Sequence, residues 1–368
     1  MSRRRMAESS APPLNALDYQ RLGDAALAAS DPGLAGYVSG GAGDELTLRA
    51  NRDAFERWAL CPRAMQGVEQ VDLRAEILGA RLSMPVLAAP LAYLGMAAER
   101  GEMATARAVG ALGTAMCVSP FTTVPLADLA GAGDGPAPWF QLYLLRDRGA
   151  TRALAEQAVA AGAGALVVTV DAPRLGRRER DLRSGFAISG EVPLPMLEAV
   201  SSRHRRMSPV ELFELVDSGA GWSRVEELAE LTALPLVVKG VLAAADARAA
   251  CDHGAAGVVV SNHGGRQLDG ARAGLKALPE VVDGLGGRAA VLLDGGVRRA
   301  ADVVKALALG ADAVLLGRPV FWALAARGEA GVTHLLSLLR DELELTLALL
   351  GCAAPEDVRL EHLRRADA

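Results

Sequence analysis

An imidazole and a guanidinium lie three residues apart in the stretch Ser261–Gly270, which reads SNHGGRQLDG. Histidine titrates near neutral pH and can act as a general base, and arginine can bind a carboxylate through two parallel hydrogen bonds. The stretch directly follows the apolar run Gly257–Val260, and two glycines between His263 and Arg266 let the backbone turn tightly. A single histidine is more often structural, but this combination favours a site in which a base meets an anionic substrate.

Polar and cationic residues also follow the other short apolar runs of the chain. Taken alone, each has an ordinary structural explanation, because Asp171 could cap a helix, Lys239 could be a solvated strand end and Tyr143 could belong to the core. Taken together, side chains that can bind a ligand or transfer a proton follow nearly every apolar run. A purely structural protein does not need such a pattern. The residues are Pro90, Ser119, Gln141 with Tyr143, Thr169 with Asp171, Lys239, Ser261 with His263 and Arg266, Asp294-Gly295-Gly296 with Arg298, and Gly317 with Arg318.

Eight apolar runs must position these residues. Continuous apolar runs of about four to eight residues suit strands buried on both faces, as in a parallel sheet. Helical patterns with apolar residues at three- and four-residue steps lie between them, for example over 100–112 and 243–253. Strand then helix, eight times over, predicts an α/β fold, a (β/α)8 TIM barrel with an N-terminal helical cap and a long loop after strand 4. A doubly wound open sheet is the structural alternative, but the spacing of the units favours closure. The runs are 84–90, 113–119, 138–143, 165–171, 234–240, 257–263, 290–296 and 313–318.

The last two runs end in residues typical of a phosphate site. In TIM barrels, chemistry gathers at the C-terminal ends of the strands, and phosphate groups often bind after strands seven and eight. The segment Asp294–Arg298 reads DGGVR, and Gly317 and Arg318 end the eighth run. Glycines expose backbone N–H groups and arginines add charge-assisted hydrogen bonds. We therefore expect a phosphate-bearing ligand at the same rim as the histidine.

The remaining segments are assigned by pattern. We expect residues 1–14 to form a disordered leader and 15–368 to form a single barrel domain, in which 15–83 is a mainly helical cap. The connection over 172–233 is much longer than the others and is interpreted as a lid or loop with a helix. The segment from Gly331 onward, with LLSLLRDELELTLALLG, is predicted to form a closing amphipathic helix.

Composition places the chain among ordinary globular proteins. Of its 368 residues 51% are hydrophobic, and 39 Lys and Arg against 44 Asp and Glu give a formal net charge of −5. This balance argues against nucleic acid or an anionic membrane as a partner. Four widely separated cysteines argue against a disulfide framework or a metal site, and no apolar run is long enough for a membrane helix. We expect a cytoplasmic protein.

Several segments together resemble the FMN-dependent 2-hydroxy-acid oxidase/dehydrogenase family, which includes glycolate, lactate and mandelate oxidases. The similarity extends from about Leu17 to Cys352. It rests on SNHGGRQLDG (261–270), TVDAPRLGRRERDLR (169–183), WFQLY (139–143), LPLVVKG (234–240), DGGVRRAADVVKALALGA (294–311) and GRPV (317–320). The resemblance implies that the barrel domain binds FMN.

The resemblance also implies a role for each residue. His263 would take a proton from the substrate, and Asp171 would pair with the imidazole and stabilise its charged form. Lys239 would lie at the N1–C2=O edge of the flavin, where negative charge develops on reduction. The catalytic residues implied are His263, Asp171, Tyr143, Arg266 and Lys239. The substrate-binding residues implied are Tyr37, Tyr143, Arg178, His263 and Arg266, the arginines at the carboxylate. The FMN-binding residues implied are Pro90, Leu91, Ala92, Ser119, Gln141, Thr169, Lys239 and Ser261, with Asp294, Gly295, Gly296, Val297, Arg298, Gly317 and Arg318 at the ribityl chain and phosphate.

Three departures from the family pattern concern the substrate's side chain. Val38 stands where many relatives have a second bulky residue, Pro120-Phe121 replaces a Ser-Trp pair of glycolate oxidase, and Tyr93 replaces a smaller or aliphatic residue of several relatives. An aromatic pocket favours a larger or aryl substrate such as a mandelate, although hydrophobic pockets discriminate only modestly.

The expected reaction is FMN-dependent oxidation of an (S)-2-hydroxy acid to the 2-oxo acid, with O2 as acceptor and H2O2 as product, in a homo-oligomer, by family analogy a tetramer. Two mechanisms are compatible with this reaction. In one, the base removes the proton at C2 and a carbanion forms; in the other, the hydrogen at C2 is transferred as a hydride. One alternative passes the electrons to a quinone or another acceptor, and another is a tailoring oxidase of a biosynthetic pathway. A non-enzymatic binding role predicts loss of His263, Asp171 or the arginines, and none is missing.

Overall fold

The computed structural model describes residues 14–188, 191–198 and 209–366. The predicted leader, 1–14, therefore lies outside the described residues except for its last position. Two parts of the long connection over 172–233, residues 189–190 and 199–208, also lie outside them.

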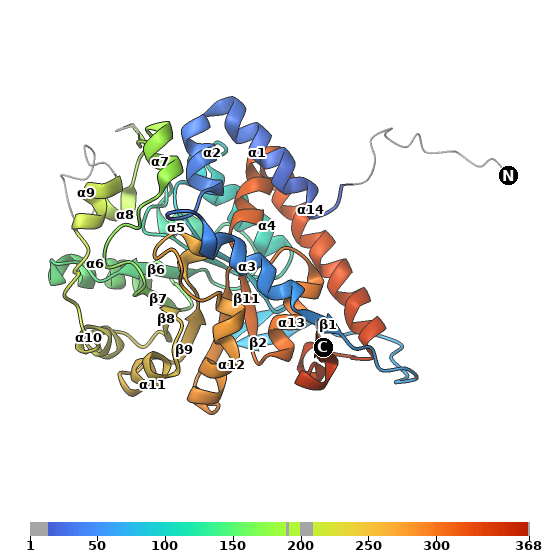
Figure 1. Ribbon diagram of the computed structural model, residues 1–368. Helices are drawn as coiled ribbons and strands as arrows, with labels where there is room; N and C mark the ends of the chain where they lie inside the picture. Colours follow the sequence, from blue (N-terminus) through green and yellow to red (C-terminus); the bar gives the residue numbers. More distant parts are fainter. Residues whose placement is uncertain (1–13, 189–190, 199–208, 367–368) are drawn as a thin grey trace.

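Eight parallel strands close into a barrel, as the eight apolar runs predicted (Figure 1). Around the barrel the strands follow the order β10-β11-β4-β5-β6-β7-β8-β9, so each strand pairs with its neighbours in sequence and the last strand pairs with the first. The open-sheet alternative is thereby wrong. The strands are β4 (Val86–Leu91), β5 (Met116–Val118), β6 (Trp139–Tyr143), β7 (Leu166–Thr169), β8 (Leu236–Val241), β9 (Gly257–Val260), β10 (Ala290–Asp294) and β11 (Ala313–Leu316).

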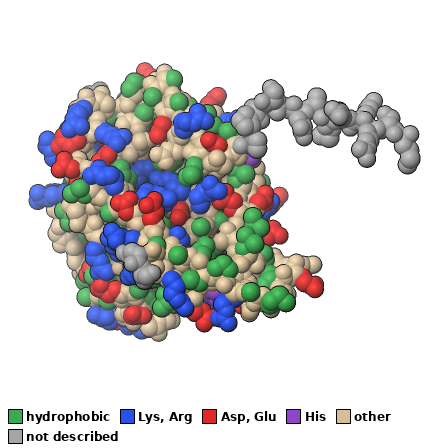
Figure 2. Space-filling model, turned by 45° about the vertical axis from the view of Figure 1, so that its right-hand side comes forward, with side chains coloured by type: hydrophobic (Ala, Val, Ile, Leu, Met, Phe, Trp, Pro, Cys, Tyr) green, Lys and Arg blue, Asp and Glu red, His purple; other side chains and the backbone are tan. Residues whose placement is uncertain are grey.

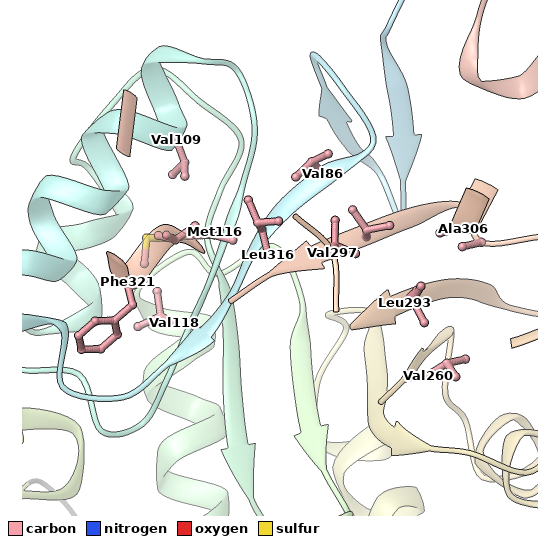
Figure 3. Packing of buried hydrophobic residues seen from close by; sticks show 14 of the residues in the cluster. Val86, Val109, Met116, Val118, Val260, Leu293, Val297, Ala306, Leu316 and Phe321 are labelled. Atoms are coloured by element: carbon pink, nitrogen blue, oxygen red, sulfur yellow. The ribbon is translucent and has the colours of Figure 1, made fainter. Parts of the chain in front are cut away.

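Alternate side chains along each strand point into the barrel or out toward the helices, because side chains alternate across a strand. The inward set forms a packed cluster inside the barrel, which includes Trp139, Val237 and Val259. The outward set belongs to the larger cluster between barrel and helices (Figure 3). Figure 3 labels Val86, Met116, Val118, Val260, Leu293 and Leu316 from the strands, with Val109 and Ala306 from helices. Burial on both faces explains why the runs are apolar without interruption.

Helices surround the barrel (Figure 1). Apart from three short helices in the long connection after β7, those between and after the barrel strands are α4 (Gly101–Ala111), α5 (Leu126–Ala130), α6 (Arg148–Ala160), α10 (Ser223–Leu231), α11 (Ala244–Asp252), α12 (Gly274–Leu285), α13 (Ala300–Ala308) and α14 (Arg318–Leu350). The helix predicted from Gly331 thus begins earlier, directly after β11. Arg327 and Gly328 have non-helical backbone angles and break α14, so the predicted segment is its second part.

The region before the barrel is helical only in its first part. It contains α1 (Asp18–Ser30), α2 (Pro32–Ser39) and α3 (Leu46–Glu56), followed by the short strands β1 (Trp58–Leu60), β2 (Ala75–Ile77) and β3 (Ala80–Leu82). The β2–β3 hairpin contributes Ile77 and Leu82 to the cluster inside the barrel. Because Leu78 lies against Gly257, the first residue of β9, the hairpin covers the N-terminal end of the barrel. The opposite end is left for the site.

Smaller elements complete the described chain. The long connection after β7 contains α7 (Glu179–Ser184), α8 (Pro195–Glu198) and α9 (Pro209–Glu214), and α7 lies beside α2 (Figure 1). The short 3-10 helices are η1 (Leu94–Met96), η3 (His263–Gly265), η4 (Pro355–Asp357) and η5 (Leu360–His362), and β12 (Leu363–Arg365) pairs antiparallel with β1. Within the described ranges, no helix is both long and apolar enough to cross a membrane.

Candidate active site

A cavity opens at the C-terminal ends of the barrel strands. The cavity and its solvent-open mouth together contain about 1140 Å³ of space not filled by protein atoms. Of the residues predicted for the site, only Asp171 and Ser261 do not line it, and both bond to residues that do. Those that line it are Tyr37, Pro90, Leu91, Ala92, Ser119, Gln141, Tyr143, Thr169, Arg178, Lys239, His263, Arg266, Asp294, Gly295, Gly296, Val297, Arg298, Gly317 and Arg318.

Strand register explains why so many of these residues meet. Val237 and Val259 point into the barrel, so Lys239 and Ser261, two residues further on, point inward as well at the end of their strands. The same step of two places further residues at the top of the inward rows: Ser119, Gln141 with Tyr143, Thr169 and Asp294. The polar residues therefore form a ring of side chains on top of the packed barrel interior.

His263 is paired with Asp171 across the mouth of the barrel. The Nδ1 atom of His263 lies 2.8 Å from Oδ1 of Asp171. Burial lowers the pKa of His263, and Asp171 raises it; burial prevails, so the pKa lies below its ordinary value. The imidazole is therefore neutral at pH 7, with Nδ1 donating to the carboxylate and Nε2 left as the basic nitrogen.

The backbone that carries His263 is unusual. His263 has φ +59°, and Gly264 and Gly265 that follow have φ +66° and +76°. Only glycine adopts this left-handed region without strain, so the histidine is held there by its surroundings. Its backbone N–H donates to Oγ of Ser261 at 3.0 Å, and the side chain of Asn262 accepts from Gly265 N at 3.0 Å.

Asn51 supports this turn and was not predicted from the sequence. Its side-chain amide exchanges two hydrogen bonds with that of Asn262, at 2.9 and 2.8 Å, and both residues are buried. Asn51 lies on α3, more than 200 residues before Asn262 in the chain, so no local signal in the sequence connects them. The pair fixes η3 to the N-terminal region.

Lys239 belongs to a buried ion pair beneath the cavity. Its Nζ lies 3.0 Å from Oδ2 of Asp294 and 3.1 Å from Oγ of Ser261, which itself donates to Asp294 at 2.7 Å. Burial opposes the charge of Lys239, but Asp294 and Asp171 outweigh it and raise the pKa. Lys239 is therefore a fixed ammonium group with a donor available to the cavity.

Four arginines make the cavity suited to anions. Burial, and then repulsion from Arg266, lowers the pKa of Arg178 to about 10. Burial lowers the pKa of Arg298 to about 10, with repulsion from Arg52 next. The pKa of Arg318 is well below its ordinary value because of burial and because Arg266 and Arg298 are near. Figure 2 shows Lys and Arg side chains gathered in a hollow on one face of the molecule. An anion bound among these guanidinium groups relieves their repulsion.

Two of these arginines already bond to backbone carbonyl oxygens at the end of α2. Arg318 donates to the carbonyls of Val38 and Gly40 at 2.9 and 2.8 Å, and to that of Gly264 at 3.0 Å. Arg266 donates to the carbonyls of Tyr37 and Gly40. Residues 37–40 are thereby fixed to the rim of the barrel.

Unpartnered donors and a glycine cradle fit the predicted FMN. Nε2 of Gln141 and Nε of Arg298 are buried and have no hydrogen-bond partner within the described part of the chain. Gly295 and Gly296 have φ +100° and +88°, and a Cβ on Gly296 would lie 2.3 Å from the carbonyl oxygen of Asn51. Flavin carbonyl oxygens and a phosphate are the acceptors that such donors and exposed backbone N–H groups bind. The donor set at this site therefore suits FMN.

Aromatic rings form one wall of the cavity. Ring centres lie 5.6 Å apart for Tyr93 and Phe121, 5.9 Å for Phe121 and Tyr143, and 5.4 Å for Tyr143 and Phe213. Tyr93 and Phe121 were singled out from the sequence as substrate-pocket positions, whereas Phe213, on α9, was missed. Its only signal was a lone aromatic residue in an amphipathic segment, which is as typical of a core residue.

Comparison with known proteins gives a consistent result. The family described as FMN-dependent dehydrogenase matches residues 28–365. L-lactate oxidase from Nostoc sp. is 47% identical over 355 residues, which covers 94% of this chain and 96% of that protein. Glycolate oxidase from Spinacia oleracea is 45% identical over 332 residues, covering 89% and 90%. A crystal structure of mandelate oxidase with (S)-4-hydroxymandelic acid has a TM-score of 0.89 at 41% identity, covering 96% of this chain and 98% of that one.

Proposed function

Because the chain belongs to the FMN-dependent dehydrogenase family, we propose that it oxidises an (S)-2-hydroxy acid to the 2-oxo acid and passes the two electrons to O2, which yields H2O2. The observation that carries the proposal is the His263–Asp171 pair in one cavity with Arg178 and Arg266. The similar proteins named as L-lactate oxidase and glycolate oxidase support both the substrate class and the acceptor.

His263 is the base in this proposal. A neutral imidazole can take a proton on Nε2 because Nδ1 is turned toward Asp171. As Nε2 takes the proton, the ring becomes positively charged, and the carboxylate at 2.8 Å stabilises that charge. Asp171 also fixes the ring in one orientation, which a base requires to reach its proton.

Arg178 and Arg266 are proposed to bind the substrate carboxylate. Both guanidinium groups lie near the ring of Tyr37, with carbon-to-centroid distances of 5.8 and 4.5 Å. Burial strongly raises the pKa of Tyr143, so its hydroxyl stays protonated and can donate to a substrate oxygen. These groups orient the C2–H bond of the substrate toward the base.

FMN, when bound, supplies the acceptor for the two electrons of the substrate. Gly295, Gly296, Arg298 and Arg318 are proposed to hold its phosphate and ribityl chain. For the ring and ribityl contacts we propose Pro90, Leu91, Ala92, Ser119, Gln141, Thr169, Lys239, Ser261, Asp294, Val297 and Gly317. The fixed charge of Lys239 would stabilise negative charge that develops on the bound flavin.

The aromatic wall supports a large, flat side chain on the substrate. Tyr93, Phe121, Tyr143 and Phe213 present rings that can stack against or contact an aryl group edge-on. We therefore propose an aryl 2-hydroxy acid such as mandelate as a better substrate than lactate or glycolate. The similarity to the solved structure of mandelate oxidase with (S)-4-hydroxymandelic acid supports this choice.

The test is a panel of 2-hydroxy acids mixed anaerobically with the purified protein while the flavin absorbance is followed. We expect a yellow protein that is bleached fastest by (S)-mandelate and regains its colour with air. A colourless protein that takes up no FMN, or a flavin that no 2-hydroxy acid bleaches, rules the proposal out. Turnover under air against turnover with an artificial acceptor under argon separates an oxidase from a dehydrogenase that uses another acceptor.

The proposal also covers location and assembly. We propose a cytoplasmic location, which the four free cysteines support, and a homotetramer, which the family resemblance implies. Sedimentation equilibrium at micromolar concentration measures the mass of the assembly directly.

A further inference from the structure

The loop that follows β7 and the segment that follows β9 touch backbone to backbone at the rim. A Cβ on Gly176 would lie 2.4 Å from the carbonyl oxygen of Arg266 and 2.6 Å from Cα of Gln267. A side chain at position 176 therefore has no room. This contact matters because the first segment carries Asp171 and Arg178, whereas the second carries His263 and Arg266.

Gln267 closes this contact with both ends of its amide. Nε2 donates to the backbone carbonyls of Asp171 at 3.2 Å and Arg174 at 2.9 Å. Oε1 accepts from the backbone N–H of Gly176 at 3.1 Å and from the guanidinium of Arg178 at 3.4 Å. Arg178 donates in addition to the carbonyl oxygen of Arg266 at 3.3 Å. All four hydrogen-bonding positions of one side chain thus bridge the two segments.

We propose that Gln267 is a positioning residue that holds the base, its carboxylate partner and both arginines as one rigid unit. The inference rests on the proposed function, since it concerns the groups that act on the 2-hydroxy acid. Gln267 itself does not line the cavity. It acts through the donor half of its amide on Asp171 and through the acceptor half on Arg178.

The two halves predict two separable effects. Without the donor half, the backbone of Asp171 loses a support, its carboxylate aligns less well with His263, and the imidazole loses part of what raises its pKa. Without the acceptor half, Arg178 loses a partner that orients it toward the substrate carboxylate. Small misplacements of catalytic groups can lower rates on the order of a hundred-fold.

Two variants and one control separate these effects. Gln267→Met keeps the length of the side chain and removes all four hydrogen bonds. Gln267→Glu keeps the acceptor half, removes the donors and adds a negative charge, which by itself raises the pKa of a nearby imidazole, so this variant is judged by KM and exchange. The control, Gln20→Met, replaces glutamine by methionine at an exposed position on α1. For each FMN-loaded protein we would measure the pH profile of flavin reduction, KM for the best 2-hydroxy acid, and amide hydrogen exchange over residues 171–178.

We expect Gln267→Met to raise KM about ten-fold or more, to move the acid limb of the profile to lower pH, and to speed exchange over 171–178, with FMN content unchanged. Gln267→Glu should show faster exchange over 171–178 with a smaller rise in KM, because its carboxylate still accepts from Arg178 but cannot donate to the carbonyls of Asp171 and Arg174. Parent-like KM, pH profile and exchange in a folded Gln267→Met protein overturn the inference, as does a lower melting temperature with none of these changes. If the methionine variant does not fold, parent-like exchange over 171–178 in Gln267→Glu overturns it. If no 2-hydroxy acid reduces the parent flavin, the proposed function fails, and the exchange measurement still decides whether Gln267 holds the two segments together.

Discussion

At the scale of single residues, the site depends on how burial and charge oppose each other. Burial makes His263 less basic than a free histidine, and Asp171 limits that effect. The same burial keeps Tyr143 protonated. Each group therefore occupies at neutral pH the protonation state that its proposed role needs: a base that is free to accept and a hydroxyl that can donate.

Replacing the base should stop the reaction without emptying the site. We expect His263→Ala to slow flavin reduction by on the order of 10²–10⁴-fold or more, because a positioned general base contributes about that factor. The variant should keep its FMN, since the proposed FMN contacts lie mainly on other residues. Stopped-flow absorbance under argon measures the rate. His253→Ala, whose ring stacks on Trp222 away from the cavity, is the control. Reduction at the parent rate in His263→Ala would place the base elsewhere.

The pH dependence should follow from the lowered pKa of His263. Only the neutral imidazole accepts a proton, so kcat/KM is full above the pKa and falls as pH drops through it. Because the pKa lies below the ordinary 6.5, the acid limb should lie below pH 6.5. Asp171→Asn removes an influence that raises this pKa, so the limb should move further down while the maximal rate falls. An acid limb above pH 6.5 in the parent contradicts this assignment.

At the scale of elements, Gly240, Gly296 and the short helix α9 shape the rim of the cavity. Gly296 lies against the carbonyl of Asn51 on α3, and Gly240 at the end of β8 lies against the side chain of Asp171. Strand ends, α3 and the loops thus meet with backbone in contact. At the aromatic wall, α9 adds Phe213 to rings that come from β6 and the loops after β4 and β5.

A side chain at position 296 should disturb the cradle for FMN. In Gly296→Ala the new Cβ meets the carbonyl oxygen of Asn51 at 2.3 Å, so α3 or the loop must move. We expect at least a ten-fold weaker affinity for FMN, measured by fluorescence quenching during titration. Gly287→Ala is the control. Gly287 has a similar φ of +80° but open space around an added Cβ, so this variant has the backbone strain without the clash. Equal FMN affinities in the two variants would contradict the role of the cradle.

Phe213 should influence the choice of substrate more than the rate of the chemistry. Removing its ring in Phe213→Ala takes away one aromatic contact from an aryl substrate and none from a methyl group. We expect the ratio of kcat/KM for mandelate to that for lactate to fall about ten-fold, within the usual range for apolar pockets. Lactate serves as the internal control. An unchanged ratio shows that α9 does not contact the substrate's side chain.

At the scale of the whole molecule, stability and chemistry occupy different layers of the barrel. Leu293 is fully buried between β10 and the helices (Figure 3), so Leu293→Ala should lower the free energy of unfolding by about 2–5 kcal/mol. Leu349→Ala on α14, where the side chain is 67% exposed, should change it by less than about 0.5 kcal/mol. Urea unfolding followed by circular dichroism measures both. Similar losses in the two variants would contradict the packing described for Leu293.

Much of this arrangement could be predicted from the sequence because it follows from strand period and strand ends. Once Val237 and Val259 are placed inside the barrel, Lys239 and Ser261 must meet above it. Asn51 and Phe213 could not be found that way, because their contacts with Asn262 and Tyr143 join distant parts of the chain. Gln267 stands in a recognised motif, but its partners on the loop after β7 are visible only in three dimensions.

The hairpin β2–β3 covers one end of the barrel, and the interior above it is filled with side chains within the described chain. The cavity at the C-terminal ends of the strands is therefore where we expect cofactor, acid, oxygen and peroxide to enter and leave. A keto acid that is still bound in the cavity prevents the next hydroxy acid from binding. The keto acid should therefore be a competitive inhibitor with respect to the hydroxy acid.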